Sequence, residues 1–136
     1  MAVLSHGVCR YVANNSKADL FIINHDDVKD LEKYSSIILC SGVYGDKIHK
    51  DLLRWIENIE KSSLNEQAKM YMFLTWFGRG DSEKNAIENA KDILEKKSIR
   101  LEDDYITCFG GKGFVRKNHP NTEDCENILD WVKSKS

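Results

Sequence analysis

Two segments of the sequence combine glycine with aromatic residues, which are the residue types that could hold a planar ligand. They read GVYGDK from residue 42 and TWFGRGDS from residue 75. Tyr44 in the first segment and Trp76 or Phe77 in the second could lie on either side of a flat ring. Glycines let a backbone approach such a ring closely, but they also simply make turns, and aromatic side chains also simply cover a sheet edge. The glycines concerned are Gly42, Gly45, Gly78 and Gly80.

The sequence gives weaker indications of metal-binding or catalytic residues. The four histidines are far apart, and their spacing is not typical of a metal site. The sequence has no nucleophile elbow, P-loop or dinucleotide-binding glycine motif. His49, expected one turn into a helix, is more often a solvent-facing residue than a proton donor. We therefore predict no metal and no catalytic residue.

Composition indicates a single domain over residues 1–136 that can bury a core. A net charge of -2 gives no electrostatic reason to expect nucleic acid or an anionic membrane as partner. The sequence has neither an apolar run near the ~20 residues of a membrane span nor a signal peptide, so we expect a cytoplasmic protein. Its four cysteines are expected to be reduced, with Cys40 and Cys108 as small buried hydrophobic residues.

Apolar runs typical of buried strands alternate with helical patterns. Runs are found at 18–25, 35–42, 69–76 and 105–111, and a short helical stretch at 8–16 precedes the first of them. This alternation predicts an α/β fold with a parallel sheet covered on both faces. Three helices are expected after Gly45, after Ser82 as N-cap, and after the HPNTED segment. Their apolar stripes are Ile48, Leu52, Trp55, Ile56 and Ile59; Ile87, Ala90, Ile93 and Leu94; and Cys125, Ile128, Leu129 and Val132.

The glycine- and aromatic-rich segments, together with GGKGFVRKNHP from residue 110, all follow predicted strands. Ligands of open α/β sheets bind at the carboxyl ends of the strands. The connections at the opposite edge, such as KKSIRLEDD from residue 96, are merely charged. We therefore expect the functional face at the carboxyl edge of the sheet.

Three stretches in this order resemble the short-chain flavodoxin-like family, in particular flavodoxin-domain proteins related to flavodoxin-type protoporphyrinogen oxidase. The stretches are SGVYGDKIHKDLLRWIENI, KMYMFLTWFGRGDSEKNA and YITCFGGKGF followed by HPNTEDCENILDWVK. Residues 42–50 and 118–124 correspond to two short motifs of that group. The resemblance covers residues 18–136.

The resemblance implies a three-layer αβα sandwich whose parallel sheet has the strand order 2-1-3-4-5. It also implies non-covalent FMN at the carboxyl edge, with the flavin ring between the segments that follow the third and fourth strands. Tyr44 and Trp76 or Phe77 would stack on the ring, and backbone groups of the same segments would bind its edge. These backbone groups belong to Ser41, Gly42, Val43, Gly45, Thr75, Gly78 and Gly80.

The N-terminus departs from the family. Ala2, Val3 and Leu4 offer less than the ~5–6 residues of a usual strand, so the first strand is expected to be truncated or missing. Ser5, His6 and Gly7 stand where the family has a hydroxyl-rich loop that binds the FMN phosphate. We therefore expect weakened FMN binding. A gap in the central sheet could also favour a homodimer.

Three functions agree with these expectations. The first is an FMN-dependent electron carrier, which needs a reductase or an acceptor enzyme as its redox partner. The second is a flavodoxin-like domain that has lost FMN and serves as an accessory subunit of a reductase. The third is a small flavin-dependent oxidoreductase of the protoporphyrinogen or quinone type, in which His49 or Arg79 could anchor a substrate.

Overall fold

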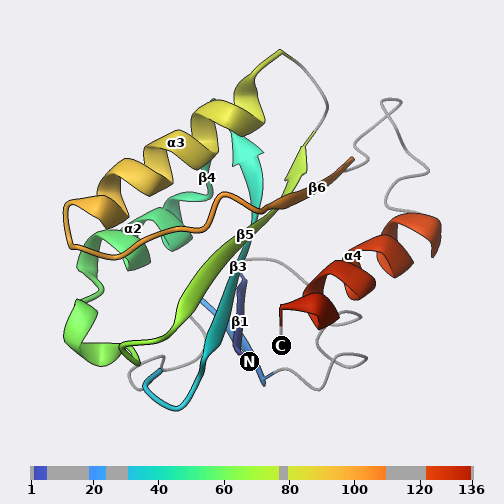
Figure 1. The fold of residues 1–136 in the computed structure, drawn as a ribbon. Helices are drawn as coiled ribbons and strands as arrows, with labels where there is room; N and C mark the ends of the chain where they lie inside the picture. Colours follow the sequence, from blue (N-terminus) through green and yellow to red (C-terminus); the bar gives the residue numbers. More distant parts are fainter. Residues whose placement is uncertain (1, 6–18, 24–30, 77–79, 110–121, 136) are drawn as a thin grey trace.

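The computed structural model of this chain describes residues 2–5, 19–23, 31–76, 80–109 and 122–135. Strands and helices alternate along these ranges, as the apolar pattern predicts (Figure 1). The elements are β1 (Ala2–Ser5), β2 (Asp19–Ile22), β3 (Ser36–Tyr44), β4 (Lys47–Ile48), α2 (Lys50–Asn58), the short 3-10 helix η1 (Lys61–Ser63), β5 (Lys69–Trp76), α3 (Ser82–Glu95), β6 (Ile106–Phe109) and α4 (Thr122–Ser134).

The sheet has the order β2-β1-β3-β5-β6, and all of these neighbours pair in parallel. This is the predicted 2-1-3-4-5 order, because the additional two-residue strand β4 pairs only with β3, antiparallel to it. Helices α2 and α3 cover one face of the sheet and α4 lies on the other, which makes three layers (Figure 1). The prediction of an αβα sandwich is confirmed.

The first strand is short but present, in the centre of the sheet. Ala2 through Ser5 pair with β2 on one side and with β3 on the other. Ala2 and Leu4 are completely buried. Four residues suffice because a central strand has ladder partners on both sides. Of the two alternatives for the first strand, the truncated one is confirmed and the missing one is wrong. The sheet therefore has no gap at this strand that would favour a homodimer.

Strand β3 is buried on both faces, and its alternating side chains enter two separate cores. Ile37 and Leu39 belong to the core beneath α2 and α3. Ile38 and Cys40 belong to the core beneath α4, where Cys40 is only 2% exposed. The prediction of Cys40 as a small buried residue is confirmed. The same prediction for Cys108 lies outside the described side chains.

The helices follow the predicted stripes with two corrections at their starts. Leu52 and Ile56 of α2 are fully buried, but the helix begins at Lys50, and Ile48 lies in β4 instead. Helix α3 has Asp81 rather than Ser82 as its N-cap residue. In α4, Ile128 and Val132 are buried against the sheet. The short helix expected at 8–16 lies outside the described residues.

Within the described ranges, no helix combines the length and the apolar composition that crossing a membrane requires.

Candidate functional site at the carboxyl edge of the sheet

The segment after the apolar part of β3 is a β-hairpin rather than the loop expected from its glycines. Val43 pairs with Ile48 and Tyr44 with Lys47, so only Gly45 and Asp46 form the turn. Both turn residues have positive φ angles, 54° and 64°. A two-residue turn of this kind matches the twist of the strands that it joins, and glycine reaches positive φ without strain. The hairpin therefore extends β3 past the sheet edge and holds Tyr44 in a defined position.

The ladder register brings several of the predicted site residues to one edge. Gly42 pairs with Thr75, Ser41 with Leu74, and Thr75 in turn with Cys108 of β6. Ser5, the last residue of β1, pairs with Cys40, one residue before Ser41. The carboxyl ends of β1, β3, β5 and β6 consequently lie side by side. This arrangement is the one in which α/β proteins bind ligands.

The remaining predicted site residues are only partly placed. Trp76 is the last residue of β5 and pairs with Phe109, but its side chain is not among those described. Gly80 lies just before α3 with a φ of 57° and has open space around it. His6, Gly7, Phe77 and Gly78 lie outside the described residues. The second wall expected for a planar ligand and the expected phosphate loop are therefore untested predictions.

Tyr44 is the most unusual side chain of this edge. It is 57% exposed, and no other large hydrophobic side chain in the described part of the chain is exposed. Its ring lies back over Gly42, because a Cβ atom built at Gly42 would be 2.9 Å from the ring atoms Cε2 and Cζ and from the hydroxyl oxygen. A flat aromatic surface that faces solvent at a ligand-binding edge is suited to stacking on a planar ligand.

His49 is not the solvent-facing helical residue that the sequence suggests. It is the N-cap of α2, and its side chain is only 16% exposed. Its backbone N–H donates to the Ser41 hydroxyl (2.8 Å), and its Nδ1 accepts from the Asp51 N–H (3.1 Å). Its imidazole meets the Tyr44 ring edge-on, with the ring centroids 5.4 Å apart. Sequence rules miss this role because Ser, Thr, Asp and Asn are the usual N-caps.

A buried carboxylate lies in the first turn of α3, which was not foreseen. Glu83 is only 8% exposed, and its side chain accepts a hydrogen bond from the Tyr105 hydroxyl (2.9 Å). Burial, and secondly the hydrogen bond to Glu83, raise the pKa of Tyr105 above its usual value of 10.0. The pair ties the start of α3 to the residue before β6.

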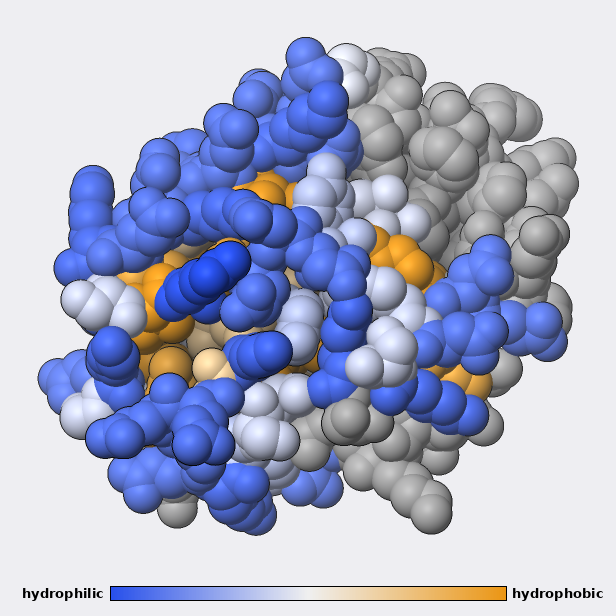
Figure 2. All heavy atoms as spheres, in the orientation of Figure 1, coloured by the Kyte–Doolittle hydropathy of each residue, from blue (hydrophilic) through white to orange (hydrophobic). Residues whose placement is uncertain are grey.

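Two adjoining hollows lie at the opposite, amino edge of the sheet, with volumes of about 220 Å³ and 590 Å³. Figure 2 shows hydrophobic residues at the bottom of a depression at the left of the molecule, inside a rim of hydrophilic ones. The smaller hollow has charges of both signs, Lys61 and Arg100 beside Glu66 and Glu102. This mixture favours no particular ligand charge. Among the described residues, no group of three or more His, Cys, Asp or Glu side chains could hold a metal ion.

The chain belongs to the flavodoxin domain family, whose pattern matches residues 5–120. An uncharacterized protein of Methanocaldococcus jannaschii is 24% identical over 137 residues, which cover 93% of this chain and 86% of that protein. The family membership confirms the resemblance found in the sequence. It also includes Ser5 and the segment after it, where the expected phosphate loop lies.

Solved structures of flavodoxins have the same fold. An archaeal flavodoxin superimposes with a TM-score of 0.69 at 10% identity, covering 98% of this chain and 93% of that one. Flavodoxin 2 of Bacillus cereus gives 0.66 at 16% identity, covering 96% and 93%. The flavodoxin of Fusobacterium nucleatum bound to flavin mononucleotide gives 0.63 at 16% identity, covering 98% and 94%.

The described residues fit the ring half of a flavin. Tyr44 offers an exposed aromatic ring, and Gly42, which has no Cβ atom, leaves the space that this ring occupies beside the strand. Thr75 is partly exposed beside Gly42, at the end of the neighbouring strand. These groups lie at one edge of the sheet, as a bound flavin ring requires.

Proposed function

We propose that this chain is an electron-transfer protein that binds FMN non-covalently at the carboxyl edge of its sheet. The observation that carries the proposal is the exposure of Tyr44, 57% of whose surface faces solvent at that edge. An aromatic ring at the carboxyl edge of an open α/β sheet, where ligands of this fold class bind, is suited to stacking on a planar ligand. The fold of the flavodoxin family supports the same conclusion.

The residues at the carboxyl edge divide the binding of FMN between them. Tyr44 stacks on the flavin ring, and Trp76 or Phe77 forms the opposite wall. Backbone groups from Ser41 to Gly45, and those of Thr75, Gly78 and Gly80, bind the polar edge of the ring. Ser5, His6 and Gly7 bind the phosphate, with fewer hydroxyls than a usual flavodoxin loop.

When bound, FMN supplies the capacity to accept and donate one or two electrons. The protein's part is to bind the ring, orient it and tune it with backbone dipoles, so no acid or base is required of the chain. The proposal includes a redox partner protein, either a reductase that supplies electrons or an enzyme that accepts them.

A titration of the purified protein with FMN, followed by flavin fluorescence and visible absorbance, tests the proposal. We expect quenching on binding. Tyr44→Ala should weaken binding about tenfold, because an aromatic contact contributes about 0.5–1.5 kcal/mol beyond burial. Tyr44→Phe keeps the ring and is the matched control, with affinity within about threefold of the wild type.

Riboflavin separates the two halves of the site, because it has the ring but not the phosphate. Similar affinities for riboflavin and FMN would show that the phosphate contacts are weak, as the short Ser5–Gly7 segment suggests. Reduced complex should then pass electrons to cytochrome c in a rapid-mixing experiment. Absence of binding to both FMN and riboflavin would exclude the carrier function and favour the accessory subunit without FMN.

A further inference from the structure

The ring of Tyr44 is positioned by contacts with two residues, Gly42 and His49. Gly42 is two positions earlier on β3, on the same side of the strand, and leaves the space that the ring fills. His49 meets the ring from the side at an interplanar angle of 82°. This edge-to-face geometry is one of the two preferred arrangements of aromatic pairs. Tyr44 therefore has a defined orientation although it is largely exposed.

His49 can act as a fixed support because its own position is held at two points. Its backbone N–H is bound to the Ser41 hydroxyl on β3, and its Nδ1 is bound to the Asp51 N–H in the first turn of α2. The first bond joins the start of α2 to β3, and the second sets the direction of the imidazole ring. Movement of this ring would therefore require breaking the cap of α2.

The presence of histidine, rather than a usual capping residue, at the N-cap of α2 indicates a second role for this side chain. Asn, Asp or Ser would cap α2 at least as well, since they are the preferred N-cap residues. None of them has a ring that could meet Tyr44. A histidine is able to do both, capping with Nδ1 while its ring contacts Tyr44.

We propose that His49 is a positioning residue that holds the Tyr44 ring in the orientation that stacks on the flavin. The proposal rests on the proposed FMN-binding function. It assigns to the N-cap of α2 a part in the flavin site, although His49 itself is not proposed to touch the flavin.

Two substitutions separate the ring of His49 from its capping atom. His49→Asn keeps a side-chain acceptor for the Asp51 N–H but has no ring. His49→Phe keeps a ring but has no capping acceptor. If the ring positions Tyr44, His49→Asn should lower FMN affinity about three- to tenfold with an unchanged Tm. His49→Phe should lower Tm by about 3 °C and lower FMN affinity less than His49→Asn does, because its ring still lies beside Tyr44 but is no longer fixed by the cap.

Gly42→Ala tests whether the position of the Tyr44 ring depends on the space at Gly42. The φ angle of Gly42 is not in the left-handed region, so alanine is compatible with the backbone, but its Cβ would displace the Tyr44 ring. We expect a loss of FMN affinity similar to that of His49→Asn. Tyr44→Ala in the His49→Asn background should cost clearly less than the tenfold expected in the wild type, since both changes act through the Tyr44 ring.

Proton NMR of the protein without flavin gives a readout that does not depend on FMN. Nuclear Overhauser effects between the Tyr44 ring and the Gly42 Hα protons should be present in the wild type and in His49→Phe, and lost in His49→Asn. Their absence from the wild type, or their persistence in His49→Asn with unchanged affinity, would overturn the proposal. Failure of the wild type to bind FMN overturns the proposed function and the flavin role of His49, while the NMR result still decides whether His49 orients Tyr44.

Discussion

The two faces of the sheet are held to their helices in different ways. Beneath α2 and α3 lies an almost entirely aliphatic core to which β1, β3 and β5 all contribute. On the other face, the described part of the core beneath α4 is smaller, with Ile38, Cys40, Tyr71 and Phe73 facing Ile128 and Val132. Burial of apolar surface therefore dominates the first face. On the second face, the described contacts of α4 also include polar ones.

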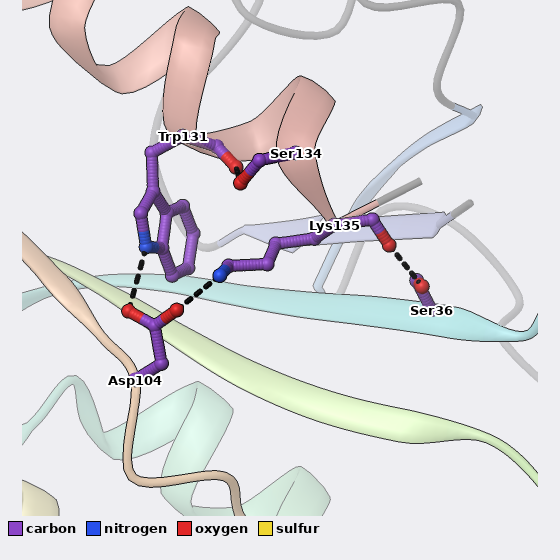
Figure 3. A network of polar contacts seen from close by, with 5 residues as sticks. All are labelled: Ser36, Asp104, Trp131, Ser134 and Lys135. Atoms are coloured by element: carbon purple, nitrogen blue, oxygen red, sulfur yellow. Dashed lines mark hydrogen bonds and ion pairs between the residues drawn. The ribbon is translucent and has the colours of Figure 1, made fainter.

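Those contacts gather at the C-terminal end of α4 (Figure 3). Trp131 packs edge-on against Tyr71, with ring centroids 6.0 Å apart, and donates its indole N–H to Asp104 (3.0 Å). Lys135 forms an ion pair with Asp104 and lies 5.3 Å from the centres of both rings. Its carbonyl oxygen accepts a hydrogen bond from the Ser36 hydroxyl. We call Ser36, Tyr71, Asp104, Trp131 and Lys135 the α4 clamp.

The two attachments should fail differently. Removing one aliphatic side chain beneath α2 leaves a cavity in a closely packed core, which is costly for the whole fold. Contacts of the α4 clamp are partly solvated and contribute less each. We therefore expect α4 to detach locally before the rest of the domain unfolds.

The largest effect is expected from Leu52→Ala in α2. Leu52 is completely buried, so its truncation should lower the free energy of unfolding by about 3 kcal/mol. Urea denaturation measures this value. Leu53→Ala is the matched control, because Leu53 is only partly buried against the same core and should cost clearly less. Equal losses would contradict the difference in burial.

A smaller and more local effect is expected from Trp131→Ala. It removes both the ring contact with Tyr71 and the bond to Asp104, for a loss of about 2 kcal/mol at a partly buried site. Amide hydrogen exchange should accelerate in α4 and remain unchanged in α2. Trp131→Phe keeps the ring and should lose less than half as much. Uniform acceleration across both helices would show that α4 does not detach separately.

The smallest effect is expected from Asp104→Asn, and it depends on pH. The hydrogen bond from Lys135, and then that from Trp131, lower the pKa of Asp104 below its usual 3.8. A lowered pKa means that the stabilisation is present above about pH 4 and is lost as pH falls through the folded-state pKa. The loss at neutral pH should be below about 1 kcal/mol, because Asp104 is mostly exposed and solvent screens the pair.

Stability curves of the wild type and Asp104→Asn, measured from pH 7 to pH 2, check this expectation. The two should converge at the acidic end. Asp103→Asn is a useful neighbour control, since Asp103 pairs with Lys91 of α3 instead and should leave hydrogen exchange in α4 unchanged. A constant difference between wild type and Asp104→Asn at all pH values would contradict an electrostatic origin.

Much of the fold could be predicted from local pattern. Continuous apolar runs such as that of β3 mark strands buried on both faces, and the stripes of α2 and α4 mark helices that cover them. The short first strand was harder to predict, since Ala2–Ser5 is stabilised mainly by its two neighbours rather than by its own length. The same holds for β4, a two-residue strand that exists only because the turn at Gly45 and Asp46 folds it onto β3.

The candidate site was predicted in part. The residue pattern identified Tyr44 and the glycines near it, and the register confirms that Ser41, Gly42 and Thr75 lie at one edge of the sheet. The role of His49 was not predicted, because capping rules do not favour histidine and because its contact with Tyr44 depends on the hairpin between them. The sequence pattern presents Asp104 only as one of several charges in a connection, whereas in the structure it binds two residues of the α4 clamp.

The resemblance to the flavodoxin-like family implied the order of the sheet. Side-chain patterns alone predicted the alternation of strands and helices and the edge at which the glycine- and aromatic-rich segments meet. These follow from side-chain periodicity and from the handedness of parallel connections, which are local or general rules. The contacts of the Tyr44 ring with Gly42 and His49, and those of the α4 clamp, depend instead on tertiary packing. Ser36 and Lys135 are 99 residues apart in sequence, and contacts over such a separation depend on how all the intervening elements pack.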